Sequence, residues 1–423
     1  MQRWTHSKLA RALAALLSLC LLVAGCVVPA ASPRTAGLPD FQATLAGITR
    51  SPGLVDVPGG VYNVPAGNLV LAASDLSADA GRRRHAIERV YNSATGAWRW
   101  SFEARYDGAS FVDATGARYD GLAALPDGSP IAGSSWDTLD GDSLRTRGGL
   151  RHDFDAQGRL ASVFWDFPGA PGVRYDWSAS ELWVMQCFDA NACVVPLFHV
   201  VLGPDGPLEV TDARAQRIDG TLRRVEYAYV DGRLVTARTP DEVARGLPGT
   251  RYTYRAVSGL VESVDDSEGV RVAYAWLGER LAVAARGGFA QPGHRFGHPQ
   301  LSSQVQGQWS VVHTHPLGGR TRILYDERGR WIASERLDAG EVATASYAGA
   351  AIRPDAITGF DGTTQTIEAY QSDEPVRLRD ASGNVVDVTH EPDGLDFDTP
   401  GRRPIRELRD SLGIIEAIHY DAA

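Results

Sequence analysis

Apolar and polar residues alternate along many short runs of this chain beyond residue 60, and glycine, aspartate or asparagine interrupts most of these runs. A period of two is typical of β-strands with one buried face. The clearest runs cover residues 67–71, 223–229, 250–255, 270–276 and 320–325. Helical periodicity with capping residues is scarce, and the best candidate is a single turn over residues 240–245. The pattern therefore predicts an all-β chain of successive antiparallel hairpins.

One turn pattern recurs between these runs: an acidic residue lies a few positions before a glycine, and a strand follows. Glycine supplies the positive φ that a tight turn needs, and the acid can accept hydrogen bonds from turn amides. The pattern occurs in FDAQGRLASV (154–163), YVDGRLVTA (229–237), YDERGRWIAS (325–334), RDASGNVVDV (379–388) and RDSLGIIEAI (409–418), with AYAWLGERLAVA (273–284) as a looser copy. We predict turn glycines at Gly158, Gly232, Gly329, Gly383 and Gly413.

These segments resemble the YD repeats of the RHS family, whose usual core is Tyr-Asp, two variable residues, Gly-Arg and an apolar residue. Residues 325–331 (YDERGRW) fit this core at every fixed position, and residues 154–160 (FDAQGRL) change only the tyrosine. Other copies depart further, since Val230 follows Tyr229 and the two late copies carry Arg379 and Arg409 instead of tyrosine. The irregular spacing implies a degenerate array with long insertions.

A second resemblance lies upstream, in VYNVPAGNLVLAASDLS (61–77), RRRHAIERVYNS (82–93) and GAWRWSFEARYDG (96–108), which look like the opening module of RHS proteins. The matching positions are Gly67, Asn68, Arg89, Tyr91, Asn92, Ser93, Gly96 and Trp98. In that family, consecutive repeats coil into a large β-shell, and full-length members enclose a C-terminal toxin. This chain ends in HYDAA, the start of another repeat. We therefore expect a curved sheet or partial RHS-type β-shell whose open edges need a partner or a continuation.

The N-terminal residues carry an export signal. Arg3, Lys8 and Arg11 precede the apolar segment ALAALLSLCLLVAG, which is too short to span a bilayer. VAGC, ending at Cys26, resembles the lipobox of bacterial lipoproteins, which implies cleavage before Cys26 and acylation of that cysteine. Val27 after the cysteine implies the outer membrane. An ordinary secretory peptide or an uncleaved anchor remains the alternative.

The chain therefore divides into four predicted parts: a lipoprotein signal peptide at 1–25, a tether at 26–60 that is rich in Pro, Gly, Ala, Ser and Thr, an RHS-type N-terminal module at 61–150, and a degenerate YD-repeat β region at 151–423.

Composition narrows the function classes. The chain is 43% hydrophobic and 22% charged, which is typical of a globular protein, and its net charge of −10 disfavours nucleic acid as a partner. Lys8 is the only lysine, so a P-loop lysine, a Schiff-base lysine and a serine–lysine hydrolase are excluded beyond the signal. We expect no cofactor.

Cys187 and Cys193 lie in LWVMQCFDANACVVPLF, where two β-prone runs flank a turn-forming segment. The two thiols would face each other across the neck of a hairpin and form a disulfide outside the cytoplasm. The chain-entropy model gives such a short loop only about 2 kcal/mol, so the bond would act as a hairpin clip. A redox or metal site is the rival hypothesis.

Two enzyme-like or metal-like patterns stay open as alternatives. Gly141-Asp142-Ser143-Leu144 spells the block of GDSL hydrolases, and Asp387 and His390 would complete a triad, whereas the competing interpretation is a polar turn. The other pattern is a set of histidines, of which His313 and His315 would share one strand face. These histidines are His294, His298, His313 and His315. Zinc or nickel is one hypothesis for them, and ordinary surface histidines are the other.

The sequence as a whole favours a non-enzymatic, lipid-anchored scaffold or interaction protein of the outer membrane or cell surface. Its partner would be a protein or a glycan, and a toxin or a cognate RHS component of a contact-dependent system is one form that this takes. Ten tryptophans and fourteen tyrosines leave carbohydrate binding on aromatic platforms as the main alternative. An envelope hydrolase that uses Ser143 is the lesser alternative.

Overall fold

The structure is a computed structural model that describes residues 54–80, 83–114, 116, 118–122, 136–141, 143–146, 150–165, 171–190, 192–220, 222–301, 307–349, 354–371, 374–390, 405–410 and 413–417. Strands make up 59% of it and helices 4%, so the predicted all-β class is confirmed. The segment predicted to be an export signal and Cys26 lie outside the described residues. Within the described part, no helix has the length and apolar character needed to cross a membrane.

An N-terminal antiparallel sheet has the strand order β1-β2-β3-β4-β5. Its strands are β1 (Leu54–Val57), β2 (Gly60–Asn63), β3 (Asn68–Ala80), β4 (Arg83–Asn92) and β5 (Ala97–Trp100). The first of these strands falls in the segment predicted to be a tether. Val57 explains the difference, because it is buried and packs into the core. A smaller sheet follows, made of β6 (Arg105–Tyr106), β7 (Phe111–Val112) and β8 (Arg118–Tyr119).

The large antiparallel sheet follows the chain order from β9 onward. Its first half contains β9 (Trp136–Asp140), β10 (Ser143–Thr146), β11 (Leu150–Phe154), β12 (Leu160–Trp165), β13 (Gly172–Trp177), β14 (Glu181–Cys187), β15 (Cys193–Leu202), β16 (Pro207–Asp212), β17 (Arg224–Val230), β18 (Arg233–Arg238), β19 (Thr250–Tyr254), β20 (Val261–Asp265) and β21 (Arg271–Leu277). Its second half contains β22 (Arg280–Arg286), β23 (His294–Phe296), β24 (Gln300–Leu301), β25 (Gln308–Thr314), β26 (Arg320–Asp326), β27 (Trp331–Arg336), β28 (Glu341–Ser346), β29 (Ala356–Thr358), β30 (Thr364–Gln371), β31 (Glu374–Asp380), β32 (Val385–His390), β33 (Ile405–Asp410) and β34 (Gly413–Ala417).

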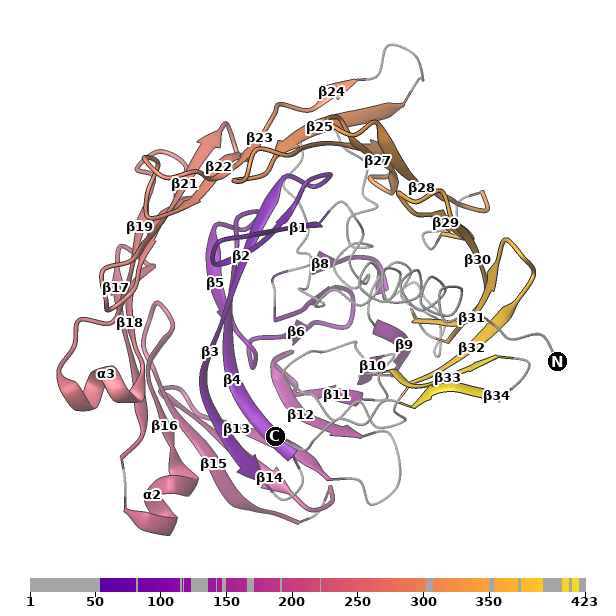
Figure 1. Cartoon of the computed structure of the whole chain (residues 1–423). Coiled ribbons are helices and arrows are strands. Elements are labelled where there is room, and N and C mark those ends of the chain that lie inside the picture. The colour runs from indigo at the N-terminus through magenta and orange to yellow at the C-terminus, as the bar shows by residue number, and fades with distance from the viewer. Residues whose placement is uncertain are drawn as a thin grey trace.

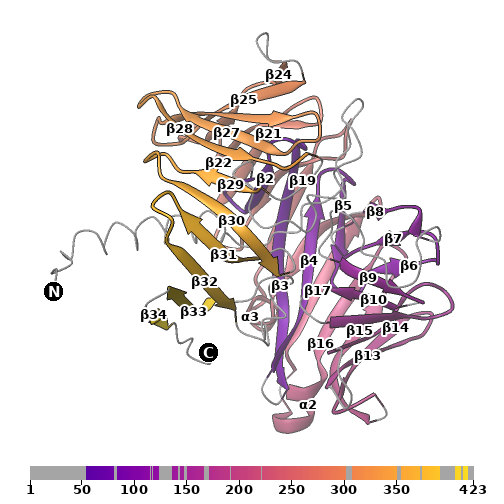
Figure 2. The ribbon, with the colours of Figure 1, turned by 90° about the vertical axis from the view of Figure 1, so that its right-hand side faces the viewer.

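The large sheet curls around the N-terminal sheet, which lies against its concave side (Figure 1). Figure 2 shows β9 and β10 on one side of the molecule and β33 and β34 on the other. The sheet is therefore wound along an axis and is not closed into a barrel. This arrangement agrees with the predicted curved sheet of successive hairpins.

Two hydrophobic clusters fill the space between the N-terminal sheet and the large sheet. One joins Ile87 and Trp100 to residues of β12–β19. The other joins Tyr62 and Leu69 to residues of β20–β28. Burial of these faces is the main favourable term for such a fold. The N-terminal sheet thus serves as the inner layer on which the large sheet is packed.

The two described helices lie in connections of the large sheet. The predicted turn at 240–245 is confirmed as α3 (Pro240–Arg245), with a reciprocal capping box between Thr239 and Glu242 and a left-handed Gly246 after it. The other helix, α2 (Ala213–Asp219), was not predicted; Asp212 caps it by accepting from the Ala215 amide.

The turn at Asp326 shows how the repeat pattern works. Its Oδ1 accepts the amides of Arg328 and Arg330, each at 2.9 Å, and the Gly329 amide donates to the Asp326 carbonyl. Gly329 has φ 64°, in the left-handed region that favours glycine. The same pattern of acceptance by the aspartate occurs at Asp155, Asp266 and Asp380.

The copy at Tyr229 is built differently. Val230 stands where the other turns have aspartate, and it pairs with Arg233 across a two-residue hairpin turn. Both central residues, Asp231 and Gly232, have positive φ, of 50° and 73°. An Asp-Gly pair with positive φ at both positions is a favoured hairpin turn. The shared glycine therefore belongs to two turn geometries. The last predicted turn glycine, Gly413, is the first residue of β34 and pairs with Asp410.

The cysteines form the predicted disulfide. Cys187 at the end of β14 pairs with Cys193 at the start of β15, and the two sulfurs are bonded. Both residues are buried against Phe164. The bond lies at the neck of the hairpin, as the sequence indicated.

The arginine after the turn glycine links neighbouring hairpins. Arg330 Nε donates to Asp326 Oδ2 at 2.6 Å, its Nη1 donates to the Gly349 carbonyl at 2.9 Å, and its guanidinium lies 4.7 Å from the centre of the Tyr347 ring. Arg159 makes the equivalent bond to Asp155 and lies over Trp177. One side chain thus holds its own turn and contacts the next hairpin.

We predict that Arg330→Lys lowers the free energy of unfolding by about 1–2 kcal/mol, because an ammonium keeps the charge but loses the planar set of donors. Urea unfolding measures this change. Arg118→Lys is the matched control, because its pair with Asp120 is exposed at both side chains. Equal effects of the two substitutions would contradict the linking role of Arg330.

Candidate functional site

The contact between the two sheets centres on a buried ion pair. The register of β3 and β4 shifts between Ser74 and Leu76, so Asp75 is the extra residue of a β-bulge. Arg89 of β4 donates through Nη1 to Asp75 Oδ1. Asp75 is 7% exposed and Arg89 5% exposed, so the pair is removed from solvent.

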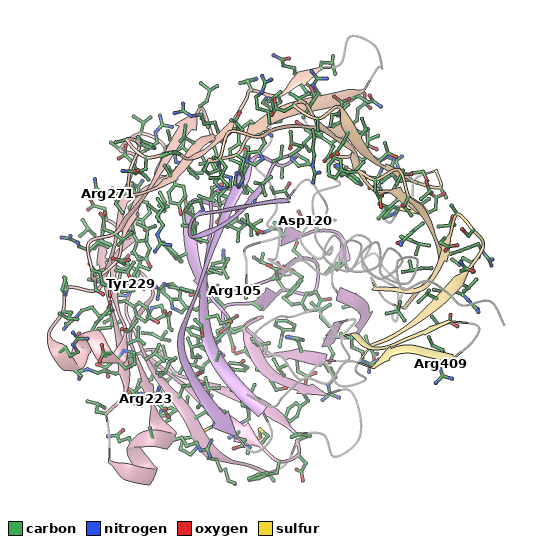
Figure 3. The ribbon with its side chains drawn as sticks, in the orientation of Figure 1. Arg105, Asp120, Arg223, Tyr229, Arg271 and Arg409 are labelled. Carbon is green, nitrogen blue, oxygen red and sulfur yellow. A yellow bond between two sulfur atoms is a disulfide. The ribbon has the colours of Figure 1, made fainter. Side chains whose placement is uncertain are left out.

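The large sheet contributes two tyrosines to this pair. Tyr227 of β17 donates its hydroxyl to Asp75 Oδ2 at 2.6 Å, and Arg89 Nη2 donates to the Tyr252 hydroxyl at 2.8 Å. The Arg89 guanidinium also lies 5.4 Å from the centre of the Trp98 ring. Burial raises the pKa of Tyr227 well above its usual value, so the phenol stays protonated and keeps donating. Figure 3 shows side chains filling the space between the two sheets.

Further bonds extend the contact along the N-terminal sheet. The Val261 amide donates to the Tyr91 hydroxyl at 3.1 Å, and the Tyr274 hydroxyl donates to the Pro58 carbonyl at 2.7 Å. Trp98 Nε1 donates to the Tyr254 hydroxyl at 3.1 Å. Each bond crosses from one sheet to the other, so the two sheets are fixed at many positions.

The residues of the segment Arg89-x-Tyr91-Asn92-Ser93 have two different structural roles. Arg89 and Tyr91 point to the large sheet, whereas Asn92 and Ser93 fix the turn of their own sheet. Asn92 Oδ1 accepts the Ala94 amide at 3.0 Å, and Ser93 Oγ accepts the Leu69 amide at 2.8 Å. These buried side chains satisfy backbone groups that would otherwise be costly to bury. The residues singled out in the sequence thus assemble a structural junction.

The bonds of this junction hold the N-terminal sheet and the large sheet together. Desolvated charges separate only at a high cost, and here each charge also has hydrogen-bonded partners. Of these residues, Arg89 was predicted from the sequence, whereas Asp75, Tyr227 and Tyr252 were not. The only local signal was an aspartate inside an apolar stretch, LAASDLS, because the tyrosines lie 152 residues or more from their partners.

The hydrolase pattern does not assemble among the described side chains. Ser143 Oγ donates to Asp153 Oδ1 at 2.6 Å, and Ser162 donates to the other oxygen of the same carboxylate at 2.7 Å. Asp387 lies on β32 and forms an ion pair with Arg377 at 3.2 Å. Figure 2 shows β10 and β32 on opposite sides of the molecule. The side chain of His390 is outside the described residues.

Three of the four histidines come together. His294 Nδ1 and His313 Nε2 are 3.0 Å apart, and the His315 ring is centred 5.2 Å from that of His294. His298 is exposed and bonds to the Pro299 carbonyl instead. The described residues contain no group of three histidine, cysteine or acidic side chains that could hold a metal ion.

An aromatic residue on the outer face is also exposed. Trp183 is 37% exposed, and its ring stacks on His199 with centres 4.2 Å apart. Glu181 lies 3.5 Å from His199 Nε2, and Asp176, opposite Trp183 in β13, is bonded by Arg174. The exposed indole thus belongs to a part of the sheet that also carries ion-paired side chains.

Comparisons with known proteins place the chain as follows. No protein-family model matches the sequence, and no curated protein matches it either. Among solved structures, the crystal structure of TcdB2-TccC3-Cdc42 is 11% identical, with a TM-score of 0.36 over 84% of this chain and 22% of that chain. The crystal structure of TcdB2-TccC3 is 12% identical, with a TM-score of 0.36 over 84% of this chain and 23% of that chain. This chain spans less than a quarter of their length.

We predict that Arg89→Met destabilises the protein by about 3–5 kcal/mol, because it leaves the Asp75 carboxylate buried without its cation. Urea unfolding measures the loss. Arg245→Met is the control, since the exposed Arg245–Asp241 pair should contribute about 1 kcal/mol or less. The double substitution Arg89→Met/Asp75→Leu should recover part of the loss. Equal losses in Arg89→Met and Arg245→Met would contradict the role of the junction.

Proposed function

We propose that this protein is a YD-repeat scaffold of the RHS type, held at the outer membrane by lipid on Cys26, that presents its β-sheet surface to a protein partner. A toxin or a cognate RHS component is the kind of partner that the sequence resemblance implies. The proposal includes no catalytic activity, and the bonding of Ser143 to a carboxylate rather than to a histidine supports that part.

One observation carries the proposal. The two segments that resemble RHS proteins, the opening module and the Asp-Gly turns, meet in one structure in which the first is packed inside the second. The module supplies Arg89 and the hairpins supply Tyr227 and Tyr252. A rigid, curved sheet with an inner layer leaves its outer face, its turns and its edges for contact with other molecules.

A second function, glycan binding, is favoured by Trp183. Its exposed indole on the outer face has an acid and a guanidinium nearby, which is the chemistry that binds a pyranose ring by stacking and hydrogen bonds.

The scaffold function can be tested in cells with a photo-crosslinking amino acid. We expect at least one of two highly exposed positions, Val257 and Leu317, to give a discrete adduct whose partner mass spectrometry identifies, while the buried control position Leu182 gives none. Cys26→Ser should release the protein from the membrane fraction and abolish the adduct. Membrane-bound protein that gives an adduct at neither exposed position would contradict the scaffold proposal. Retention of Cys26→Ser in membranes would contradict the lipid anchor.

Glycan binding makes a separate prediction. Trp183→Ala should weaken binding to a glycan array about tenfold, because one stacking contact contributes about 1.5 kcal/mol. Phe188→Ala is the control, since Phe188 is exposed at the turn of the same hairpin. If wild-type protein retains no glycan, or both variants bind equally, the glycan hypothesis is wrong.

A further inference from the structure

Strand β23 is the narrowest link in the described large sheet. It contains three residues and lies between β22 and β25. Its paired positions are Arg295 with Val283 and His294 with Ala284 on one side, and Arg295 with Thr314 and Phe296 with His313 on the other. Among the described strands of the large sheet, no other strand is joined to neighbours on both sides through so few positions. The halves of the sheet are therefore most easily separated here.

Histidines concentrate at this link. His294 comes from β23, His313 from β25, and His315 follows β25. The rings of His294 and His313 are nearly parallel, and their nitrogens are 3.0 Å apart, so one nitrogen donates and the other accepts. His313 is 8% exposed. The hydrogen bond between the two rings persists when one ring carries a positive charge, because the other ring still offers an acceptor nitrogen. It is lost when both rings are charged, because two imidazolium rings have no acceptor between them.

The neighbouring elements offer little to neutralise a charge on these rings. Opposite His313, β26 presents Thr321, and opposite His294, β22 presents Ala284. The negative charge of Asp56, in β1 of the N-terminal sheet, raises the pKa of His294 and so favours its protonated form. On the neighbouring strands β26 and β27, the guanidinium of Arg320 is bound to Asp338 and that of Arg336 to Glu341. Asp56 is thus the one carboxylate in the described residues that acts on the pair.

The same link contacts the N-terminal sheet. The His313 ring stacks on Phe296 with centres 4.8 Å apart, and Phe296 packs on Tyr62 of β2 with centres 4.5 Å apart. Tyr62 is 2% exposed. A continuous stack therefore runs from the histidine pair to the inner layer. Movement of His313 would disturb both the sheet and its packing on the N-terminal sheet.

We propose that the His294–His313 pair is an acid-sensitive latch, whose protonation opens the large sheet at β23 and loosens the contact between Phe296 and Tyr62. Acid then separates the part of the sheet before β23 from the part after it, while the Arg89 junction stays intact. The device changes which edges of the sheet are exposed without unfolding the protein.

The direction of the pH effect follows from the local environment. Burial, followed by the charges of His294 and His315, lowers the pKa of His313 from 6.5 to about 4. The opened form, with an ordinary histidine, binds more protons than the closed form between these two values. Opening therefore becomes easier as the pH falls through 6.5, and the effect is complete near pH 4.

Hydrogen exchange measured by mass spectrometry on the full chain tests the latch. Between about pH 7.5 and about pH 4.5, after correction for intrinsic exchange rates, we expect protection in β22, β23 and β25 to fall on the order of 100-fold. The hairpin of β14 and β15 should keep its protection and serves as the internal reference. His313→Gln and His294→Asn place an amide near each bonding nitrogen and remove the titration, so the double variant should lose the pH dependence.

His298→Gln is the matched control, because His298 is exposed and lies outside the pair. It should behave as the wild type does. A loss of protection spread evenly over the β14–β15 hairpin and the β22–β25 segment would overturn the proposal, as would an unchanged pH dependence in the double variant. If the double variant is already open at about pH 7.5, a wild type without local opening at low pH still overturns it.

Discussion

The structure depends on one desolvated contact between charges. Arg89 and Asp75 belong to the N-terminal sheet, but two further groups that bond to them, Tyr227 and Tyr252, belong to the large sheet. A buried ion pair without these partners would cost more free energy than it returns. The N-terminal sheet therefore reaches a favourable state only when the large sheet has curled around it. This makes the two sheets one cooperative unit.

The dependence of each sheet on the other explains how the large sheet is stably curved although it is not closed into a barrel. A sheet with one apolar face must cover that face, and most sheets do so with helices or a second sheet. Here the N-terminal sheet covers a large share of it, through the two clusters around Trp100 and Tyr62. The large sheet is free to wind along its axis because the inner layer, and not closure of its edges, supplies the packing.

Local features could be predicted from the sequence, and distant contacts could not. The hairpins, the turn at Asp326, helix α3 and the bond between Cys187 and Cys193 each depend on residues close together in the chain. Tyr227 is 152 residues from Asp75, and alternation fixes its face but not its partner. In the same way, the sequence placed His313 and His315 on one face, whereas only the pairing of β23 with β25 brings His294 to them.

The chain contains a single lysine, Lys8, and its structure makes wide use of arginine. Beyond Lys8 every residue with a permanently basic side chain is arginine. The planar guanidinium of arginine makes contacts here that an ammonium group cannot reproduce. Arg330 bonds its own turn, bonds the next hairpin and stacks on Tyr347. Arg233 and Arg336 lie over the rings of Tyr254 and Phe360 in the same way. In a curved sheet, adjacent hairpins diverge, so a side chain that binds in several directions at once holds them in place. The Gly-Arg pair of the repeat is thus a joint between hairpins, with glycine making the bend and arginine fastening it to the next.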